Sequence, residues 1–354
     1  MVKPGMDARL GVVIVTFNAA DVILDCLESL LGSHDVALRI VVVDNASTDD
    51  TLQVMHSWAA GDIPYAPAQD LPFIPTVAAK PIGLTSDISA NLTPGHQIIL
   101  VKNEMNAGFA AGVNRGLAQL AAVPGLDRFW VLNPDSVVTA STAAAFANHP
   151  APVGGFALMG GRVLYCPSDG VIQIDGGTIN RRTGITGNLN QYAPHPATPA
   201  HDPARMDFIT GASMVASRQF YERAGPLPED YFLYYEEVDW ALRRGDLPLI
   251  YCPGGIVYHR AGTAIGSATL NRPASPFSLY FKHRSRLRFM RRYFPRAVVF
   301  AQAYSVAKAA QLLLKGYPVE ARTLLSASFG RPPAKDIRAR LSPEAANLAF
   351  GPEQ

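Results

Sequence analysis

Short apolar segments that alternate with amphipathic segments constrain the fold of this chain most strongly. Residues 10–16 (LGVVIVT) and 39–43 (RIVVV) are short, apolar and β-branched, which is typical of strands buried on both faces. Between them, residues 21–31 carry apolar side chains at helical spacing. Strand, helix and strand in such close succession predict parallel strands joined by right-handed crossovers. We therefore expect an α/β fold with a mostly parallel sheet and flanking helices.

The same alternation continues along the chain. We expect a helix over 48–58 with Ser47 or Thr48 as its cap, a strand over 97–102, a helix near 110–120 and a strand over 128–132. Prolines interrupt residues 61–95, which predicts a loop-like insertion, and residues 154–204 predict hairpins and loops. An ordered block runs from Phe208 to about Arg260. The rest is helical from Ser275 to Gly330, then polar and loose.

Composition excludes several classes of protein. Hydrophobic residues make up 48% and charged residues 17% of the 354 residues, so the chain can bury a large core. Its 31 basic and 29 acidic residues leave a net charge of +2, which does not indicate a nucleic-acid partner. Cys26, Cys166 and Cys252 are too scattered for a disulfide framework or a zinc site. With no apolar segment near the first residues, we expect a cytoplasmic protein.

In open parallel sheets, ligands bind beyond the carboxyl ends of the strands. Thr16 and Asn18 follow the first expected strand, Asp44 and Asn45 the second, and Asp135 the fourth. These side chains are therefore the candidates for contact with a ligand.

The two common phosphate-binding loops are missing from the sequence. Residues 16–20 (TFNAA) contain no glycine where a dinucleotide-binding turn needs G-x-G-x-x-G, and the P-loop pattern does not occur. A diphosphate would then be neutralised by a hard divalent cation on carboxylate oxygens.

Asp135 and His259 are candidate ligands for such a cation. Asp135 stands in an Asn-Pro-Asp-Ser turn directly after a strand, and His259 ends an apolar strand. Each residue alone is more often structural, since a lone Asp commonly serves its own turn. Together they form a candidate metal site.

Residues 230–240 (DYFLYYEEVDW) form an acidic cluster among large apolar residues. In a helix, Glu236 and Asp239 share one face, while Glu237 points about 100° away. One explanation is that acids in the first helical turn interact favourably with the helix dipole. The other is acid–base chemistry.

These motifs together resemble the inverting GT-A glycosyltransferases of family 2, especially their bacterial rhamnosyltransferase-like branch, over about residues 10–267. The resemblance implies a GT-A (Rossmann-like) fold with a C-terminal helical extension. It is carried by VVIVTFN (12–18), VVVDNASTDDT (41–51), NAGFAAGVNRG (106–116), LNPDS (132–136), residues 207–240 and VYHRAG (257–262).

The resemblance also implies a donor site for a nucleotide sugar. Asp44 would accept a hydrogen bond from a pyrimidine ring N–H, and Asn133 replaces the first Asp of the family's D-x-D motif. The nucleoside pocket would be formed by Thr16, Phe17, Asn18, Asp44 and Asn45, and the ribose and diphosphate would be lined by Asn106, Gly108 and Asn114.

In the same way, the resemblance implies Asp135 and His259 as ligands of Mg²⁺ or Mn²⁺. Glu237 matches the family's catalytic base, usually Asp, and Glu236 is the neighbouring alternative. Asp239 would be a supporting acid near the acceptor. The base would remove the proton of the acceptor hydroxyl in a single displacement that inverts the anomeric centre, while the cation stabilises the leaving diphosphate.

Seven basic residues and no acid fall within residues 282–296, interleaved with aromatic and apolar side chains. This run predicts an anionic membrane surface or an anionic ligand as partner, and a solvated helix face is the alternative. The apolar segment 297–314 carries a narrow polar stripe with Lys308 at its middle, which makes it a poor transmembrane span. We expect an interfacial or packed helix, peripheral on the inner face of the cell membrane, where polyprenyl-linked acceptors are found.

The resemblance thus implies transfer of a sugar, rhamnose in the branch that the chain resembles, from a dTDP- or UDP-sugar to a glycan or lipid-linked acceptor in cell-surface polysaccharide synthesis. We expect a nucleotide-binding half (1–145), an acceptor-binding and catalytic half (146–267) and a helical extension (268–354). The alternatives are a nucleotidyltransferase and a non-catalytic protein that binds sugar nucleotides or glycans.

Overall fold

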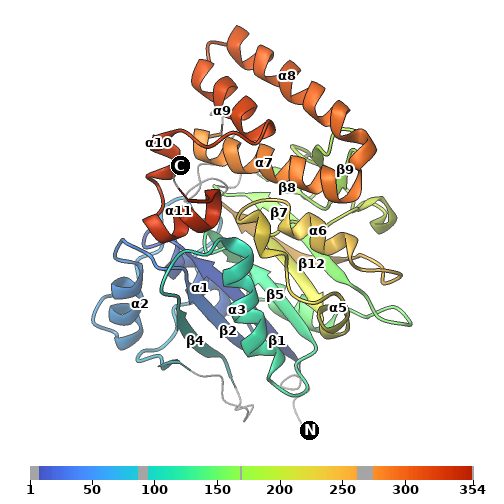
Figure 1. Cartoon of the computed structure of the whole chain (residues 1–354). Helices are drawn as coiled ribbons and strands as arrows, with labels where there is room; N and C mark the ends of the chain where they lie inside the picture. Colours follow the sequence, from blue (N-terminus) through green and yellow to red (C-terminus); the bar gives the residue numbers. More distant parts are fainter. Residues whose placement is uncertain (1–7, 87–94, 168–169, 261–273, 353–354) are drawn as a thin grey trace.

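A large mixed β-sheet forms the centre of the protein (Figure 1). The computed structural model describes residues 8–86, 95–167, 170–260 and 274–352. Within them the sheet has the order β3-β4-β2-β1-β5-β11-β7-β12-β6, with β8 paired to β7. Its strands are β1 (Arg9–Thr16), β2 (Ala37–Asp44), β3 (Leu84–Thr85), β4 (Gln97–Lys102), β5 (Arg128–Leu132), β6 (Ser136–Val138), β7 (Leu158–Tyr165), β8 (Ile172–Ile174), β11 (Ser213–Ser217) and β12 (Ile250–His259).

Most strands of this sheet run in one direction. The pairs β3–β4, β4–β2, β2–β1 and β1–β5 are parallel, and so is β7–β12. Only β11, β6 and β8 run against their neighbours. The carboxyl ends of β1, β2, β5 and β12 therefore lie at one edge, as expected for a mostly parallel α/β sheet.

Helices cover both faces of the sheet because alternate strand residues are apolar on both sides. Val12 and Ile14 of β1 pack in one core with α1 (Ile23–Leu31), α2 (Thr51–Ala60) and α4 (Thr142–Asn148). Val13 and Val15 pack in a second core with α3 (Phe109–Ala121), α5 (Arg218–Ala224) and α6 (Glu236–Leu242). The expected flanking helices are thus present.

The first part of the chain follows the expectation closely, with one correction at a helix cap. Helix α2 begins at Thr51, with Asp50 as its N-cap residue. Ser47 and Thr48 do not cap it. The Ser47 hydroxyl instead donates to Asp44, and the Thr48 N–H donates to the side chain of Asn18. Both residues thus bind within the loops that follow β1 and β2.

The region 154–204 contains a hairpin, β9 (Gly177–Ile179) with β10 (Thr186–Asn188), as expected. It also supplies β7, a buried strand inside the main sheet. The two expected halves therefore share one sheet, because β6 from the first half pairs with β12 from the second. Ala261 and Gly262 of the VYHRAG motif lie outside the described residues.

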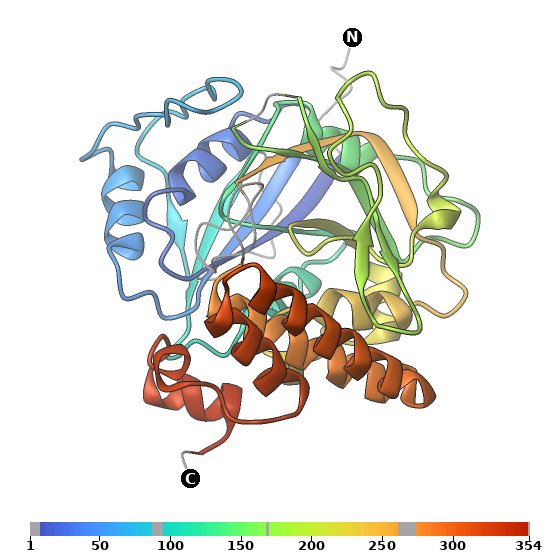
Figure 2. The same cartoon turned by 90° about the horizontal axis from the view of Figure 1, so that it is seen from above.

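The C-terminal helices lie together at one end of the molecule, above the carboxyl edge of the sheet (Figures 1 and 2). The expectation of a loose tail after Gly330 is wrong, since Ile337, Ala345 and Ala349 pack in one core with Phe277 and Phe281. The spacing of these small apolar residues already indicates short helices. The extension contains α7 (Pro276–Tyr293), α8 (Val298–Leu314), α9 (Pro318–Ser328), α10 (Lys335–Arg338) and α11 (Pro343–Phe350).

Candidate active site

The loops after β1 and β2 form a hydrogen-bonded unit that excludes water from several expected donor residues. Thr16 and Asp44 are buried, and the Thr16 hydroxyl donates to Asp44 Oδ1 over 3.1 Å. Asp44 also accepts from the N–H and hydroxyl of Ser47. Phe17 is half-buried and Asn18 is exposed, with a φ of 53°. Of this group, Phe17 and Asn18 are the side chains best placed to meet a ligand.

Asn45 joins this unit to the start of α3. Its buried side chain donates to the carbonyl of Gly108 over 2.9 Å and accepts from Asn103 over 2.8 Å. Asn106 stays half-buried and accepts from the N–H of Gly108 over 3.0 Å. The expected donor residues of β2 and of the segment before α3 are therefore brought together.

Gly108 lies where the nucleotide-side loops meet the acidic segment. Its φ is +93°, and a Cβ atom there would lie 2.4 Å from the carbonyl oxygen of Phe232. The next residue, Phe109, donates its N–H to that same oxygen over 2.9 Å. No other residue fits this backbone contact, which explains why the motif carries glycine here.

Asn114 lies apart from this group. Its side chain donates to the carbonyl of Leu227 and to Glu229, and accepts from the N–H of Leu227. These bonds fasten α3 to the segment before the acidic cluster. The expected contact of Asn114 with ribose or diphosphate therefore does not agree with its place in the structure.

Asp135 and His259 lie side by side at the carboxyl edge of the sheet. Asp135 Oδ1 is 3.1 Å from His259 Nε2, and Asn133 Nδ2 is 3.2 Å from the same nitrogen. His259 Nδ1 is 2.8 Å from Gln173 Oε1 of β8. An amide oxygen only accepts, so Nδ1 carries a proton, which leaves Nε2 as the ring nitrogen that would bind a cation shared with Asp135.

This donor set fits a divalent cation. Two neighbouring ligands of an octahedral cation, each about 2.1 Å from the metal, are about 3 Å apart. The side chains of Asp135 and His259 are 10% and 11% exposed, so a ligand can still reach them. Among the described residues no three His, Cys, Asp or Glu side chains gather as a metal cluster. Further ligands would come from water or a bound diphosphate.

Gln173 is a residue that the sequence reasoning missed. It is the one polar side chain of the short strand IQI, and it is buried. A buried amide between two apolar strand residues is an available signal, because such groups need a partner. The partner itself, His259, is set only by the fold.

The acidic cluster stands at the start of α6, as expected. Glu236 is buried and its Oε2 has no hydrogen-bond partner among the residues that the structure describes, while Glu237 is half-buried. Burial and the adjacent Glu237 raise the pKa of Glu236 well above its ordinary value. Burial raises the pKa of Glu237 to about 7, against backbone N–H groups and Lys282, which lower it. Such a pKa suits a general base at neutral pH.

One short loop, residues 211–212 before β11, contacts both Glu237 and the segment that carries Asp135. A Cβ atom on Gly211 would be 3.9 Å from Glu237 Cβ. The next residue, Ala212, accepts a hydrogen bond from the N–H of Asn133 over 3.0 Å. The candidate base thus lies against the same short segment before β11 that bonds the turn carrying Asp135.

Lys282 belongs to this site and not to a separate basic surface. Its side chain keeps solvent contact, yet burial lowers its pKa, and the carboxylate of Glu237 raises it. The positive charge of Lys282 in turn lowers the pKa of Glu237. Sequence reasoning placed Lys282 in the membrane-facing run because helix spacing alone does not show which carboxylate lies opposite.

Asp239 has a different environment from its neighbours. Its side chain is fully buried and accepts hydrogen bonds from Tyr231, Arg243, Arg292 and Tyr293. These bonds hold α6 against α7 and fill both carboxylate oxygens. The expectation that Asp239 supports the acceptor directly therefore does not agree with its contacts.

Most arginines of the basic run likewise make internal contacts. Arg286 is buried and donates to the carbonyls of Thr183 and Ala301. Arg284 lies over the ring of Phe281, and Arg288 pairs with Asp230. These residues of the run join α7 to the rest of the protein.

Residues 11–67 match the model of the family described as Glycosyl transferase family 2. The matched segment spans β1 to the end of α2 and contains the first two expected motifs. Together with the strand order, this match identifies the fold as GT-A-like, a mostly parallel mixed sheet with flanking helices and a C-terminal helical region. A comparison with curated protein sequences gave no match.

Solved structures with a similar course of the chain include three proteins of low sequence identity. A mannosyltransferase from Pyrobaculum calidifontis, in complex with GDP-Man and Mn²⁺, is 15% identical, with 93% of this chain and 88% of that chain covered and a TM-score of 0.49. S. aureus TarS 1-349 is 14% identical, with 97% of this chain and 86% of that chain covered and a TM-score of 0.47. The Mycobacterium tuberculosis glucosyl-3-phosphoglycerate synthase, in complex with Mn²⁺, UDP and phosphoglyceric acid, is 14% identical, with 81% of this chain and 78% of that chain covered and a TM-score of 0.42.

Proposed function

We propose that this protein is a glycosyltransferase that moves a sugar from a nucleotide diphosphate donor to a hydroxyl acceptor with inversion. One observation carries the proposal. A half-buried carboxylate, Glu237, whose pKa is raised to about 7, lies against the loop before β11, and the same loop bonds the turn that carries Asp135 beside His259. A base and an anion-neutralising site in one place are what a direct displacement at an anomeric carbon requires.

The chain's own residues supply the chemistry of the acceptor side. Deprotonated Glu237 accepts the proton of the acceptor hydroxyl as that oxygen attacks the anomeric carbon. Lys282 holds part of the Glu237 population deprotonated at neutral pH by opposing its burial. Glu236 beside it is buried, and burial together with the charge of Glu237 raises its pKa well above the ordinary value, which favours its neutral form.

On the donor side, Phe17 and Asn18 border the nucleoside pocket, and Asn106 lies toward the ribose. Asp44 and Asn45 position these loops through their buried hydrogen bonds. Asp135 and His259 would hold Mg²⁺ or Mn²⁺, with Asn133 beside them. The bound cation supplies charge neutralisation for the departing diphosphate.

We propose a dTDP- or UDP-sugar as donor, with rhamnose as the first sugar to test. The acceptor is a glycan or a polyprenyl-linked glycan in cell-surface polysaccharide synthesis, and the protein acts on the inner face of the cell membrane. The motif order that resembles the rhamnosyltransferase-like branch supports this choice, as does the apolar surface described below.

The deciding experiment incubates the protein with a panel of UDP- and dTDP-sugars, with Mg²⁺, Mn²⁺ or EDTA, and measures the nucleotide released. We expect release of UDP or dTDP that stops in EDTA, and a transferred sugar whose NMR coupling shows an inverted anomeric centre. Formation of UTP or dTTP from the same sugar nucleotides when pyrophosphate is added would instead indicate a nucleotidyltransferase. Donor binding without turnover in any acceptor mixture would indicate a binding protein.

A further inference from the structure

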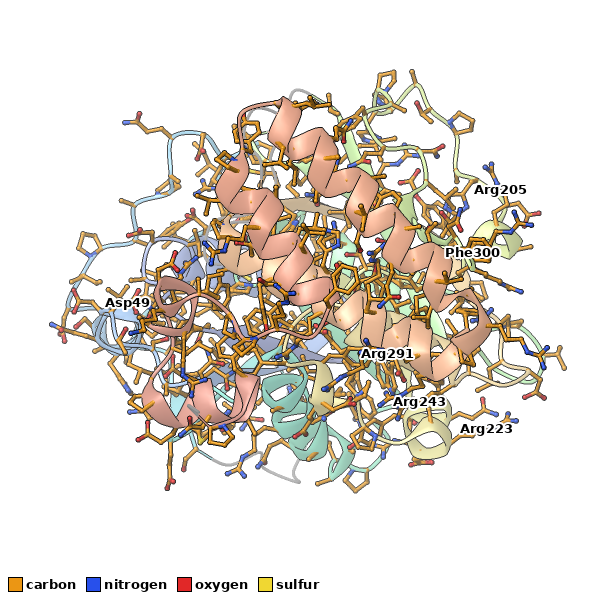
Figure 3. The ribbon with its side chains drawn as sticks, turned by 45° about the horizontal axis from the view of Figure 1, so that its top comes forward. Asp49, Arg205, Arg223, Arg243, Arg291 and Phe300 are labelled. Atoms are coloured by element: carbon orange, nitrogen blue, oxygen red, sulfur yellow. The ribbon has the colours of Figure 1, made fainter. Side chains whose placement is uncertain are left out.

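The exposed face of α8 is apolar along its whole length. Apart from Gln311, every exposed residue of this helix is apolar, and Phe300 and Leu314 are 56% and 90% exposed. Figure 3 shows Phe300 on this outermost helix. The outer face of α8 consists of Val299, Phe300, Ala303, Val306, Ala307, Ala310, Leu313 and Leu314.

Apart from Gln311, the polar residues of α8 are buried or half-buried. Ser305 is buried and accepts hydrogen bonds from Arg286 of α7 and from Ser328 of α9. Gln302 and Lys308 are half-buried. A surface helix of a soluble protein normally has the opposite arrangement, with its apolar stripe toward the core. Such a face indicates a partner that is itself apolar.

The composition and length of this segment agree with lipid contact. Pro295–Leu314 is, within the part of the chain that the structure describes, one helical stretch long and apolar enough to cross a membrane. One side of α8 packs on α7 and α9, and Ser305 on that side accepts a hydrogen bond from Arg286 of α7. Lipid therefore cannot surround the helix. A helix with one side held by protein and one side apolar suits the membrane interface.

Exposed basic residues on both sides of α8 in the sequence favour an anionic surface. Arg291 and Arg296 precede the helix, and Lys315 and Arg322 follow it, all four exposed. Between residues 291 and 329 the sequence has a single acid, Glu320. Two copies of this chain, joined face to face, would bring these like charges together, whereas lipid phosphates would neutralise them.

We propose that the outer face of α8 inserts into the headgroup–acyl boundary of an anionic membrane, with Arg291, Arg296, Lys315 and Arg322 at the lipid phosphates. Binding through α8 is independent of the transfer reaction, so it can be tested without a donor. It also places α7, which carries Lys282, directly below the membrane-bound layer, because Arg286 of α7 binds the Ala301 carbonyl and Ser305 of α8.

The test is flotation of the full-length protein with vesicles of phosphatidylcholine and phosphatidylglycerol. In the variant with Phe300→Glu and Leu314→Glu, the partition coefficient should fall by about tenfold or more, because two apolar side chains leave the lipid and two like charges enter it. The matched control is Val153→Glu, in a fully exposed loop before β7, which should bind as the wild type does. Circular dichroism melting checks that each variant folds.

A second variant distinguishes attraction to the charge of the lipids from insertion of the apolar side chains. Replacing Arg291, Arg296 and Lys315 with Gln should weaken binding to the anionic vesicles by about fivefold per charge and leave binding to pure phosphatidylcholine unchanged. Equal flotation of the wild type and the Phe300→Glu, Leu314→Glu variant would overturn the proposal. So would a wild-type dimer in sedimentation that the same variant converts to monomers, because the occupant of the face would then be a second copy.

Discussion

Asp135 and His259 meet because of strand register. Ser136 of β6 pairs with His259 of β12, and the N–H of Arg260 donates to the carbonyl of Asp135. These ladder contacts bring Asp135 Oδ1 to 3.1 Å from His259 Nε2, although 124 positions separate the two residues in the sequence (259 − 135 = 124). The chain therefore uses a short edge strand to place a carboxylate beside an imidazole.

Replacing Asp135 with Ala should abolish metal-dependent donor turnover and leave the fold intact. Asp135 is a turn residue, so its side chain contributes to the ligand set more than to the core. The measurement is nucleotide release with Mg²⁺ or Mn²⁺, together with the melting temperature. Asp127→Ala, in the turn before β5, is the matched control and should keep full activity. Normal turnover of the Asp135→Ala enzyme in EDTA would refute the metal site.

Gln173→Leu should weaken Mn²⁺ binding by about 10- to 100-fold, because His259 Nδ1 loses the acceptor that keeps Nε2 free for a metal. Mn²⁺ binding can be followed by electron paramagnetic resonance without any substrate. Gln173→Glu keeps an acceptor oxygen and should retain most of the affinity. Equal Mn²⁺ affinity in the Leu variant would mean that Gln173 has only a packing role.

Glu237→Gln should retain donor binding and lose transfer by roughly 10²–10⁴-fold, the usual contribution of general base catalysis. Glu236→Gln should lose less, because Glu236 is buried and Glu237 retains solvent contact. Transfer rate and donor affinity are measured for both variants at saturating acceptor. An inactive Glu236→Gln beside an active Glu237→Gln would move the base by one residue.

The transfer rate should rise with pH through about 7, because Glu237 acts as a base only when deprotonated and its pKa is raised to about 7. Lys282→Met removes a positive charge that lowers this pKa, so the rise should move to higher pH. The pH profile of kcat measures both effects. Lys308→Met is the control. It removes a charge that acts on Lys282, so it should shift the pH profile less. A shift to lower pH in Lys282→Met would contradict the assignment.

Asp239→Ala should lower the free energy of unfolding by about 3–5 kcal/mol, because it leaves Arg292 and two tyrosine hydroxyls without their buried acceptor. Asp230→Ala removes a half-exposed partner of the same arginine and should cost about 1 kcal/mol or less. Urea unfolding measures both. Equal small losses would show that Asp239 does not hold α6 to α7.

The sequence alone determined the four parallel strands β1, β2, β4 and β5, the helices between them and the polar residues at the ends of those strands. Periodicity predicts β4 and β5 to the residue, because a buried strand must be apolar on both faces and ends where polar residues begin. The position of Asp44 and Asp135 after strands follows from the same pattern. These features are local, since they depend on neighbours a few positions away.

Only the tertiary structure decided what each polar side chain faces. Glu237 and Asp239 are two residues apart, yet one reaches solvent beside Lys282 and the other is enclosed by Tyr231, Arg243, Arg292 and Tyr293. The polar stripe on α8 likewise shows that sequence spacing does not reveal what a side chain faces. Amphipathic spacing revealed two faces on that helix, but the contacts with α7 and α9 decided that the polar face is the inner one, because hydrogen-bond partners for Ser305 lie there.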